Sequence, residues 1–219
     1  MPKSHFKHEL FTEFARVGKA LSHANRLELL EFIAQGEQSV EELAKKAGLS
    51  TANTSQHLQQ LRHAGLVTTR KEGLKVYYQL SGNDVITAIN AVRIVAERHI
   101  AEVDRLISHF LYKKDDLEPI YREELMDRVN AGSVTIIDVR PAEEYQAGHV
   151  PGAMNIPVTD IEKQLDTLPA DQEIVAYCRG PHCVLAFDAV AQLRQCGRKV
   201  RRLEDGFPEW MQAGFPIEK

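Results

Sequence analysis

The chain has few cysteines: Cys178, Cys183 and Cys196 are the only three in 219 residues, and all lie in the last third. An odd number in this arrangement excludes the paired framework of a small disulfide-stapled domain. The N-terminus lacks the apolar core of a signal peptide, and no run approaches the roughly 20 apolar residues of a membrane span. We therefore expect a cytoplasmic protein.

Neither sign of charge dominates the chain, whose formal net charge is −4. Residues 1–116 carry 16 Lys and Arg against 14 Asp and Glu, whereas residues 117–219 carry 11 against 17. A nucleic-acid surface is therefore expected only in the first part. The length suits two modest cores. We predict two domains, 1–114 and 115–219, on either side of the polar run at 113–116.

Capping residues indicate where helices start and end in the first part of the chain. Ser22 is placed to cap a helix that Gly36 ends. Ser39 and Glu42 have the spacing of a capping box, which opens a second short helix that ends at Gly48. A tight turn follows, so a third helix starts close behind the second.

The third helix, Thr51–His63, is expected to be capped by Ser50 and has an unusual polar face. A solvated helix face normally carries Lys and Glu, but here neutral amides and hydroxyls prevail, and these match the donors and acceptors of base edges in a major groove. Two short helices joined by a Gly-containing turn indicate a helix-turn-helix. The candidates for DNA contact on this helix are Thr51, Asn53, Thr54, Ser55, Gln56, His57 and Gln59.

Residues 66–80 predict a β-hairpin with its turn at Glu72-Gly73. This segment and the end of the preceding helix carry the one local cluster of cations in the first part of the chain. Such cations suit phosphates, which position a protein on DNA without reading its sequence. The cluster consists of Arg62, Arg70, Lys71 and Lys75.

Residues 8–112 resemble the ArsR family of winged-helix repressors. The stretches that carry the resemblance are Leu21–Leu27, Leu43–Ser50, Ser55–Leu58, Gly65–Val67 and the pair Tyr77-Tyr78 after Gly73. The resemblance implies a homodimer that binds an imperfect palindrome in double-stranded DNA and releases it on ligand binding or thiol modification. A winged helix used only for protein contacts is the alternative.

The metal sites of this family lack their ligands here. Metal-sensing members use a Cys-x-Cys pair before the recognition helix, and no cysteine precedes Cys178 in this chain. A second family site uses His and carboxylates on the last helix, of which His99 and Glu102 match one half only. We therefore predict no metal and no cofactor.

Residues 84–112 are predicted to form one long last helix. Its apolar positions alternate in steps of four and three, as in a coiled-coil seam. A helix of this length, roughly 40 Å at about 1.5 Å per residue, exceeds what one small domain covers, so we expect the seam to pair with a second subunit. The seam positions are Val85, Ile89, Val92, Ala96, His99, Val103, Leu106 and Phe110.

Strands alternate with helices in the second part, which predicts a parallel sheet covered by helices on both faces. The strands are expected at 134–139, 173–177 and 199–203, and the helices around 123–129 and at 160–168 and 184–195. In such sheets ligands bind at the carboxyl ends of strands, and Cys178 follows one of them directly.

The loop after Cys178 is suited to hold a thiolate. Backbone N–H groups of a tight loop converge on one point, and the N-terminus of the following helix adds a positive field, which stabilises negative sulfur. The loop residues assigned to this cradle are Arg179, Gly180, His182 and Cys183. The alternative is that Cys178 is a small buried hydrophobic residue.

Residues 118–219 resemble a single rhodanese domain. The resemblance rests on Ile137–Pro141, Glu144-Tyr145, Gly148–Pro157, the Cys178 loop and Gly206–Trp210. It implies an α/β three-layer fold and sulfurtransfer, in which Cys178 takes a sulfane sulfur from thiosulfate or another donor as a persulfide and passes it to a thiol acceptor. The groups Asp138, Arg140, Glu144 and His149 are interpreted as mainly structural.

A related class, the Cys-x5-Arg phosphatases and arsenate reductases, needs an arginine six residues after the nucleophile. Val184 stands there, which excludes this class. Cys183, at the far end of the loop, is close enough to attack a persulfide on Cys178 and give a disulfide. Alternatively, Cys183 merely packs at the start of the helix.

Together these patterns predict a mainly α winged helix-turn-helix domain followed by an α/β rhodanese-like domain. The function that they favour is a DNA-binding transcriptional regulator, a repressor by family resemblance, whose operator binding depends on the sulfur state of Cys178 and Cys183. Two alternatives stay open. In the first, the chain is primarily a sulfurtransferase that also regulates its own expression. In the second, its rhodanese-like domain only recognises an anion.

Overall fold

A computed structural model describes residues 3–112, 114–115 and 118–219 of the protein. The chain divides into two compact units, 1–91 and 92–219. Of the polar run predicted to separate the domains, positions 113 and 116 lie outside the described residues. Within the described residues, none of the helices combines the length and the apolar character needed to cross a membrane.

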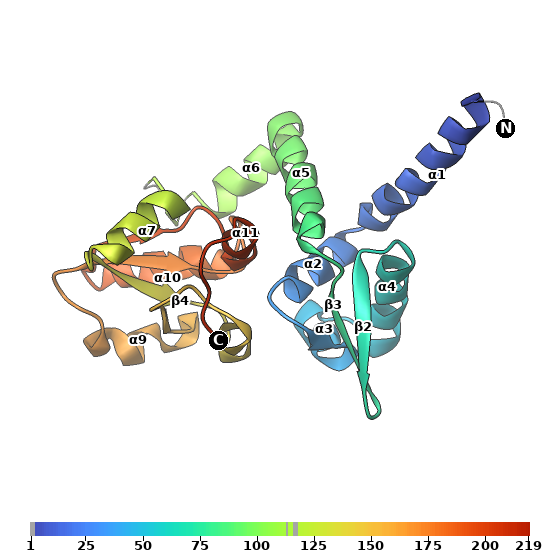
Figure 1. Ribbon diagram of the computed structural model, residues 1–219. Coiled ribbons are helices and arrows are strands. Elements are labelled where there is room, and N and C mark those ends of the chain that lie inside the picture. Colours follow the sequence, from blue (N-terminus) through green and yellow to red (C-terminus); the bar gives the residue numbers. More distant parts are fainter. Residues whose placement is uncertain (1–2, 113, 116–117) are drawn as a thin grey trace. The chain divides into compact units, whose positions relative to one another are not determined.

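The first unit is a winged helix-turn-helix (Figure 1). Helix α1, Lys3–Leu21, precedes three short helices and a hairpin that projects beyond them. The short helices are α2 (Ala24–Ile33), α3 (Val40–Ala47) and α4 (Thr51–His63), and the strands are β1 (Gln38–Ser39), β2 (Val67–Glu72) and β3 (Lys75–Leu80). The three strands form an antiparallel sheet in the order β1-β3-β2.

The caps of these helices confirm most of the local predictions. Ser39 and Glu42 form both hydrogen bonds of the capping box at the start of α3, and Ser50 accepts a hydrogen bond from the backbone N–H of Asn53 at the start of α4. The predicted cap at Ser22 is wrong. The hydroxyl of Ser22 donates to the carbonyl of Lys19, whereas the ring of His23 accepts from the N–H of Asn25 and caps α2.

The predicted last helix is two helices, α5 (Asn83–His99) and α6 (Ala101–Phe110). Ile100 interrupts the helix with extended backbone, at φ −113° and ψ 101°. The 4-3 spacing of apolar residues continues on both sides of this residue, so the spacing alone could not locate the break. Of the predicted seam, Val85 is buried in the core of the first unit, whereas Val92, Leu106 and Phe110 are exposed.

The rest of the second unit is a three-layer α/β domain. Its four strands are all parallel, in the order β5-β4-β6-β7. The strands are β4 (Val134–Asp138), β5 (Met154–Asn155), β6 (Glu173–Tyr177) and β7 (Val200–Arg202). The helices are α7 (Arg122–Asn130), α8 (Ala142–Ala147), α9 (Ile161–Gln164), α10 (Val184–Gln195) and α11 (Phe207–Gln212), with short 3-10 turns at Val158–Asp160 and Leu165–Thr167.

Alternate residues of the strands enter two separate cores, as a sheet buried on both faces requires. Ile174 and Ala176 of β6 pack in the core that includes residues of α9 and α10. Val175 and Tyr177 pack in the opposite core, which includes Leu125 of α7 and Trp210 of α11. Strand β6 is therefore packed on both faces, and this packing fixes the position of Cys178, which follows its last residue.

Candidate functional site

Cys178 follows the last residue of β6 and begins a loop that ends at Cys183, the N-cap residue of α10. Both cysteines are buried, with exposed fractions of 1% and 8%. The N–H groups of Gly180 and His182 have no backbone acceptor among the described residues. Their role as a cradle for negative charge on Cys178 stays a prediction.

The structure pairs Cys178 with Cys183 as a disulfide. Their Cα atoms are 6.2 Å apart, which is within the range that disulfides adopt. In this form the sulfur of Cys178 is already bonded and cannot act as a nucleophile. The third cysteine, Cys196, is free and exposed.

Gly206 lies directly against the loop. A Cβ atom at this position would overlap the carbonyl of Arg179 and the amide nitrogen of Gly180. The next residue, Phe207, donates its backbone N–H to the carbonyl of Cys178 at 3.0 Å. The start of α11 therefore fixes the backbone of the loop, and only glycine fits at the point of closest approach.

Arg179, predicted as the cation of the loop, is held by a carboxylate. Its guanidinium makes two hydrogen bonds of 2.8 Å to Glu144 on α8. The exposed fraction of the side chain is 16% for Arg179 and 2% for Glu144. Bidentate pairs of this kind are strong and directional, so this contact attaches the loop to α8.

Behind the loop, Tyr177 belongs to a buried polar network. Its hydroxyl donates to Asp138 at 2.6 Å and accepts from the N–H of Val150 at 3.0 Å. Asp138 also pairs with Arg140, at 2.6 Å, and both side chains are fully buried. Burial and the charge of Asp138 raise the pKa of Tyr177 far above its ordinary value, so the phenol stays protonated and can donate. Asp138 and Arg140 thus brace the strands that carry the loop.

His182 contacts α5 and a cavity. Its Nε2 is 3.3 Å from Glu97, and it lines a cavity of the second unit. Burial lowers the pKa of His182, Arg93 and Arg202 lower it further, and Glu97 acts in the opposite direction.

On α4, most of the predicted DNA-reading side chains lie at the surface. Thr51, Gln56, Gln59 and Arg62 are exposed, and Asn53, Ser55 and His57 are partly exposed. The prediction for Thr54 is wrong: this side chain is fully buried, and its hydroxyl donates to the carbonyl of Ser50. Thr54 lies on the same side of the helix as Leu58 and Leu61, which pack in the core.

His57 lies beside His23, with the ring centroids 4.5 Å apart. Burial lowers the pKa of His57, and the charges of His23 and Arg26 lower it further. A neutral ring at this place on α4 offers one donor and one acceptor, which suits a hydrogen bond to a base edge.

The wing carries three of the predicted cations, of which two are exposed lysines and one is an arginine in ion pairs. Lys71 and Lys75 are exposed on β2 and β3. Arg70 contacts Glu37 at 2.6 Å and Glu72 at 2.7 Å. Both carboxylates raise the pKa of Arg70 above its ordinary value. Arg70 is therefore tied to the protein's own carboxylates, while the two lysines extend into solvent.

Family models match each part of the chain. The model described as bacterial regulatory protein, arsR family, matches residues 23–69, and that of the rhodanese-like domain matches residues 121–213. The HTH-type transcriptional regulator Rv0324 of Mycobacterium tuberculosis is 46% identical over 213 residues, which cover 97% of this chain and 93% of that protein. The chain belongs to the ArsR family. It is an ArsR-family transcriptional regulator with a C-terminal rhodanese-like domain.

Solved structures resemble the two parts of this ArsR-family protein separately. A homodimeric winged helix-turn-helix DNA-binding domain from Mycobacterium bovis is 41% identical, covers 43% of this chain and 87% of its own, and has a TM-score of 0.41. A rhodanese-related protein from Thermoplasma volcanium is 24% identical, covers 47% of this chain and 98% of its own, and has a TM-score of 0.42.

Sequence reasoning missed three features of this ArsR-family protein. No element is predicted before Ser22, although Phe6, Leu10 and Phe14 recur every four residues on α1 and are exposed. The pairing of Arg179 with Glu144 has no local signal, because 35 residues separate them. The close approach of Gly206 to the loop could have been suspected only from the presence of a glycine just before a helix.

Proposed function

We propose that this ArsR-family regulator senses sulfane sulfur through Cys178 and Cys183, and that the sulfur state of this pair changes its affinity for operator DNA. The observation that carries the proposal is the pairing of the two cysteines at opposite ends of one loop, with Cα atoms 6.2 Å apart. The rhodanese-like domain, matched over residues 121–213, supports it.

The proposed chemistry has two steps. In the reduced protein, the thiolate of Cys178 attacks the outer sulfur of a donor R–S–S⁻; a new S–S bond forms on Cys178, the old S–S bond breaks, and R–S⁻ leaves. The thiolate of Cys183 then attacks the Sγ atom of Cys178, which forms the disulfide and breaks the bond to the outer sulfur; this sulfur takes a proton from solvent and leaves as hydrosulfide. The two cysteine sulfurs are oxidised and the transferred sulfur is reduced, so no other oxidant is required.

Sulfurtransferase activity follows if an external thiol takes the sulfur before Cys183 does. In that case R′–S⁻ attacks the outer sulfur of the persulfide, and Cys178 leaves as a thiolate. Protein that starts in the disulfide form must be reduced by an external thiol before Cys178 can accept sulfur for the first time.

The DNA-binding half acts, in this proposal, as a homodimer on a palindromic operator. The exposed polar side chains of α4 read base edges, and Lys71 and Lys75 of the wing contact phosphates. Exposed large apolar residues on α1, and others on α5 and α6, support contacts between subunits, because large apolar surfaces of this kind commonly mark interaction sites. They are Phe6, Phe11, Phe14, Val92, Val95, Leu106 and Phe110.

The test measures operator affinity against sulfur state. An operator is first selected from a random duplex pool with the reduced full-length protein. Fluorescence anisotropy then gives the dissociation constant for reduced, persulfidated and disulfide protein, with mass spectrometry reporting the sulfur content of each. We expect the forms to differ by about tenfold or more, a coupling of about 1.4 kcal/mol. Cys178→Ser should respond to no donor, and Cys196→Ser should respond as the wild type does.

Two outcomes would overturn the proposal in different ways. Equal affinities for all three forms would remove the regulatory link and favour a sulfurtransferase that only regulates its own gene. Failure of Cys178 to gain sulfur from thiosulfate, polysulfide or a low-molecular-weight persulfide would remove the chemistry and leave a domain that recognises its ligand without reacting.

A further inference from the structure

Arg179, the arginine of the Cys178–Cys183 loop, is paired with a carboxylate of the protein. Its guanidinium makes two hydrogen bonds of 2.8 Å to Glu144, whose side chain is 2% exposed. An anion cannot take the place of this carboxylate without leaving Glu144 buried and uncompensated, which is costly. A donor that approaches Cys178 therefore meets a compensated ion pair at Arg179.

A second arginine beside the loop, Arg202, is compensated in a similar way. Its Nη1 donates to the carbonyls of Pro181, Leu203 and Glu204. Its Nε lies 3.8 Å from the carboxylate of Asp115, and both side chains are buried. The three carbonyls and the carboxylate thus compensate the positive charge that Arg202 brings to the loop.

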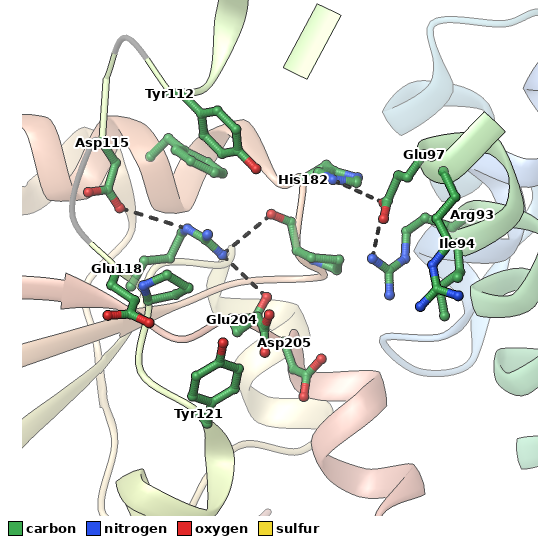
Figure 2. Close-up of a pocket in the computed structure, with 15 residues that line it drawn as sticks. Arg93, Ile94, Glu97, Tyr112, Asp115, Glu118, Tyr121, His182, Glu204 and Asp205 are labelled. Carbon is green, nitrogen blue, oxygen red and sulfur yellow. Dashed lines mark hydrogen bonds and ion pairs between the residues drawn. The ribbon is translucent and has the colours of Figure 1, made fainter. Parts of the chain in front are cut away.

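His182 is the other side chain of the loop that can carry positive charge, and its surroundings favour the neutral ring. Burial lowers the pKa of His182 below its ordinary value of 6.5, Arg93 and Arg202 lower it further, and Glu97 acts in the opposite direction. Glu97 is 3.3 Å from Nε2 of His182 and 3.1 Å from Nη1 of Arg93 (Figure 2). At pH 7 most His182 rings are therefore neutral.

Two positions of the loop backbone are unavailable to an anion. Pro181 has no N–H, and the N–H of Cys183 donates to the carbonyl of Gly180 at 3.1 Å. Helix α10 follows, and the N-terminus of a helix acts as roughly half a positive charge. This field suits a donor with one negative charge better than a donor with two.

We propose that Cys178 takes sulfur from donors that carry a single negative charge, such as persulfides R–S–S⁻, and discriminates against dianionic thiosulfate. The second charge of thiosulfate would lose water at a buried sulfur atom, beside a thiolate and next to cations that are already paired. Residues 117–219 also carry 17 Asp and Glu against 11 Lys and Arg, which repels a dianion more than a monoanion. The inference names the donor class of the site and rests on the sulfur chemistry proposed above.

Thiosulfate and methanethiosulfonate are the two probes, because a methyl group in the second replaces one charged oxygen of the first. In both reactions the thiolate of Cys178 attacks the outer sulfur, a new S–S bond forms, the old S–S bond breaks, and sulfite or methanesulfinate leaves with the electron pair. Full-length protein is reduced, freed of reductant, mixed with each donor and quenched by alkylation. Mass spectrometry of the persulfide and disulfide forms together gives the second-order rate constant, which should be higher for methanethiosulfonate.

Val184 provides the variant and its control, because it is 47% exposed and directly follows Cys183. Val184→Arg adds an exposed cation at the loop and should raise the rate constant for thiosulfate about tenfold, but that for methanethiosulfonate about threefold at most. Val184→Gln adds a polar side chain without charge and should keep both rate constants within about twofold of the wild type. Glu144→Gln, which leaves the charge of Arg179 uncompensated, should also favour thiosulfate.

The dependence on salt gives an independent readout. Salt screens repulsion, so the rate constant for thiosulfate should rise as potassium chloride is added, and it should rise more than that for methanethiosulfonate. A rate constant for thiosulfate that falls with salt would show that a cation binds this donor, and it would overturn the proposal. Equal effects of Val184→Arg on the two donors would overturn it as well. If Cys178 gains sulfur from neither donor, the sulfur chemistry itself fails, and this inference fails with it.

Discussion

At the scale of single residues, Gly206 shows how strongly one position constrains the reactive loop. Its backbone lies against Arg179 and Gly180, and α11 starts at the next residue, whose N–H holds the carbonyl of Cys178. The start of α11 is therefore attached directly to the loop. Any side chain at position 206 has to displace the backbone that positions the sulfur.

Gly206→Ala is expected to lower the unfolding free energy by about 1–3 kcal/mol, the usual cost of overpacking, and to slow alkylation of Cys178 in the reduced protein. Fluorescence of Trp210, the single tryptophan, follows urea unfolding of the same unit. The control is Gly18→Ala in α1 of the first unit, where a Cβ meets nothing within 4 Å; it should leave the unfolding transition reported by Trp210 and the alkylation rate of Cys178 unchanged. Equal alkylation rates in Gly206→Ala and wild type would show that the contact does not position Cys178.

At the scale of elements, the capping box at the start of α3 makes the helix-turn-helix sensitive to acid. The N–H of Ser39 donates to the carboxylate of Glu42 at 2.8 Å and lowers the pKa of Glu42 below its ordinary value of 4.5. Because the folded pKa is below the unfolded one, this contribution to stability is complete above the unfolded pKa. It is lost as the pH falls through the folded pKa.

We expect α3 to become less protected as the pH falls below about 4.5. Hydrogen exchange of the peptide that contains α3, resolved by mass spectrometry at stepped pH, measures the change. In Glu42→Gln the protection of α3 should depend less on pH over the same interval. Glu41→Gln, an adjacent glutamate outside the capping box, should keep the pH dependence of the wild type. An identical acid response in Glu42→Gln and wild type would assign the effect to other carboxylates.

The wing offers a second prediction at this scale. A phosphate contact made by Lys75 should lower the slope of log affinity against log salt by about one when it is replaced by glutamine. Arg70→Gln should change the slope by less than half as much, because Arg70 already contacts Glu37 and Glu72. Anisotropy titrations of the selected operator at several salt concentrations give both slopes. A larger effect for Arg70 would mean that DNA breaks its two ion pairs.

At the scale of the whole molecule, assembly depends on apolar surface that the isolated chain leaves exposed. Val92 of α5 is 43% exposed and Phe110 of α6 is 59% exposed. Val92→Asp would place a charge on the proposed subunit interface, where desolvation makes it costly. We expect the dimer dissociation constant to rise about tenfold or more.

Sedimentation equilibrium of the full-length protein measures this change. Gln195→Asp, an exposed substitution at the end of α10, is the matched control and should leave the association unchanged. Operator affinity should fall together with dimerisation, because a palindrome is read by two recognition helices at once. A dimer of unchanged strength in Val92→Asp would place the interface elsewhere.

The sequence by itself determined the local framework of this protein. Capping residues, apolar alternation and turn glycines act over a few residues, so they correctly predicted the boundaries of α4 at Thr51 and His63, the strand Glu173–Tyr177, and a cysteine at the carboxyl end of that strand. The motif stretches that resemble the two families are also continuous in sequence. Local patterns of residues were therefore sufficient to predict the fold class and the family.

Only the tertiary structure decided how individual side chains are engaged. The sequence predicts Arg179 and Arg70 as cations for ligand and DNA. In the structure Arg179 is bound by a glutamate 35 residues away and Arg70 by one 33 residues away. Thr54 faces the core, Gly206 contacts the loop, and Ile100 divides the last helix. These outcomes depend on which groups the folded chain brings within contact distance. Burial and geometry set the free energy of such contacts, and the spacing of residues along the sequence determines neither.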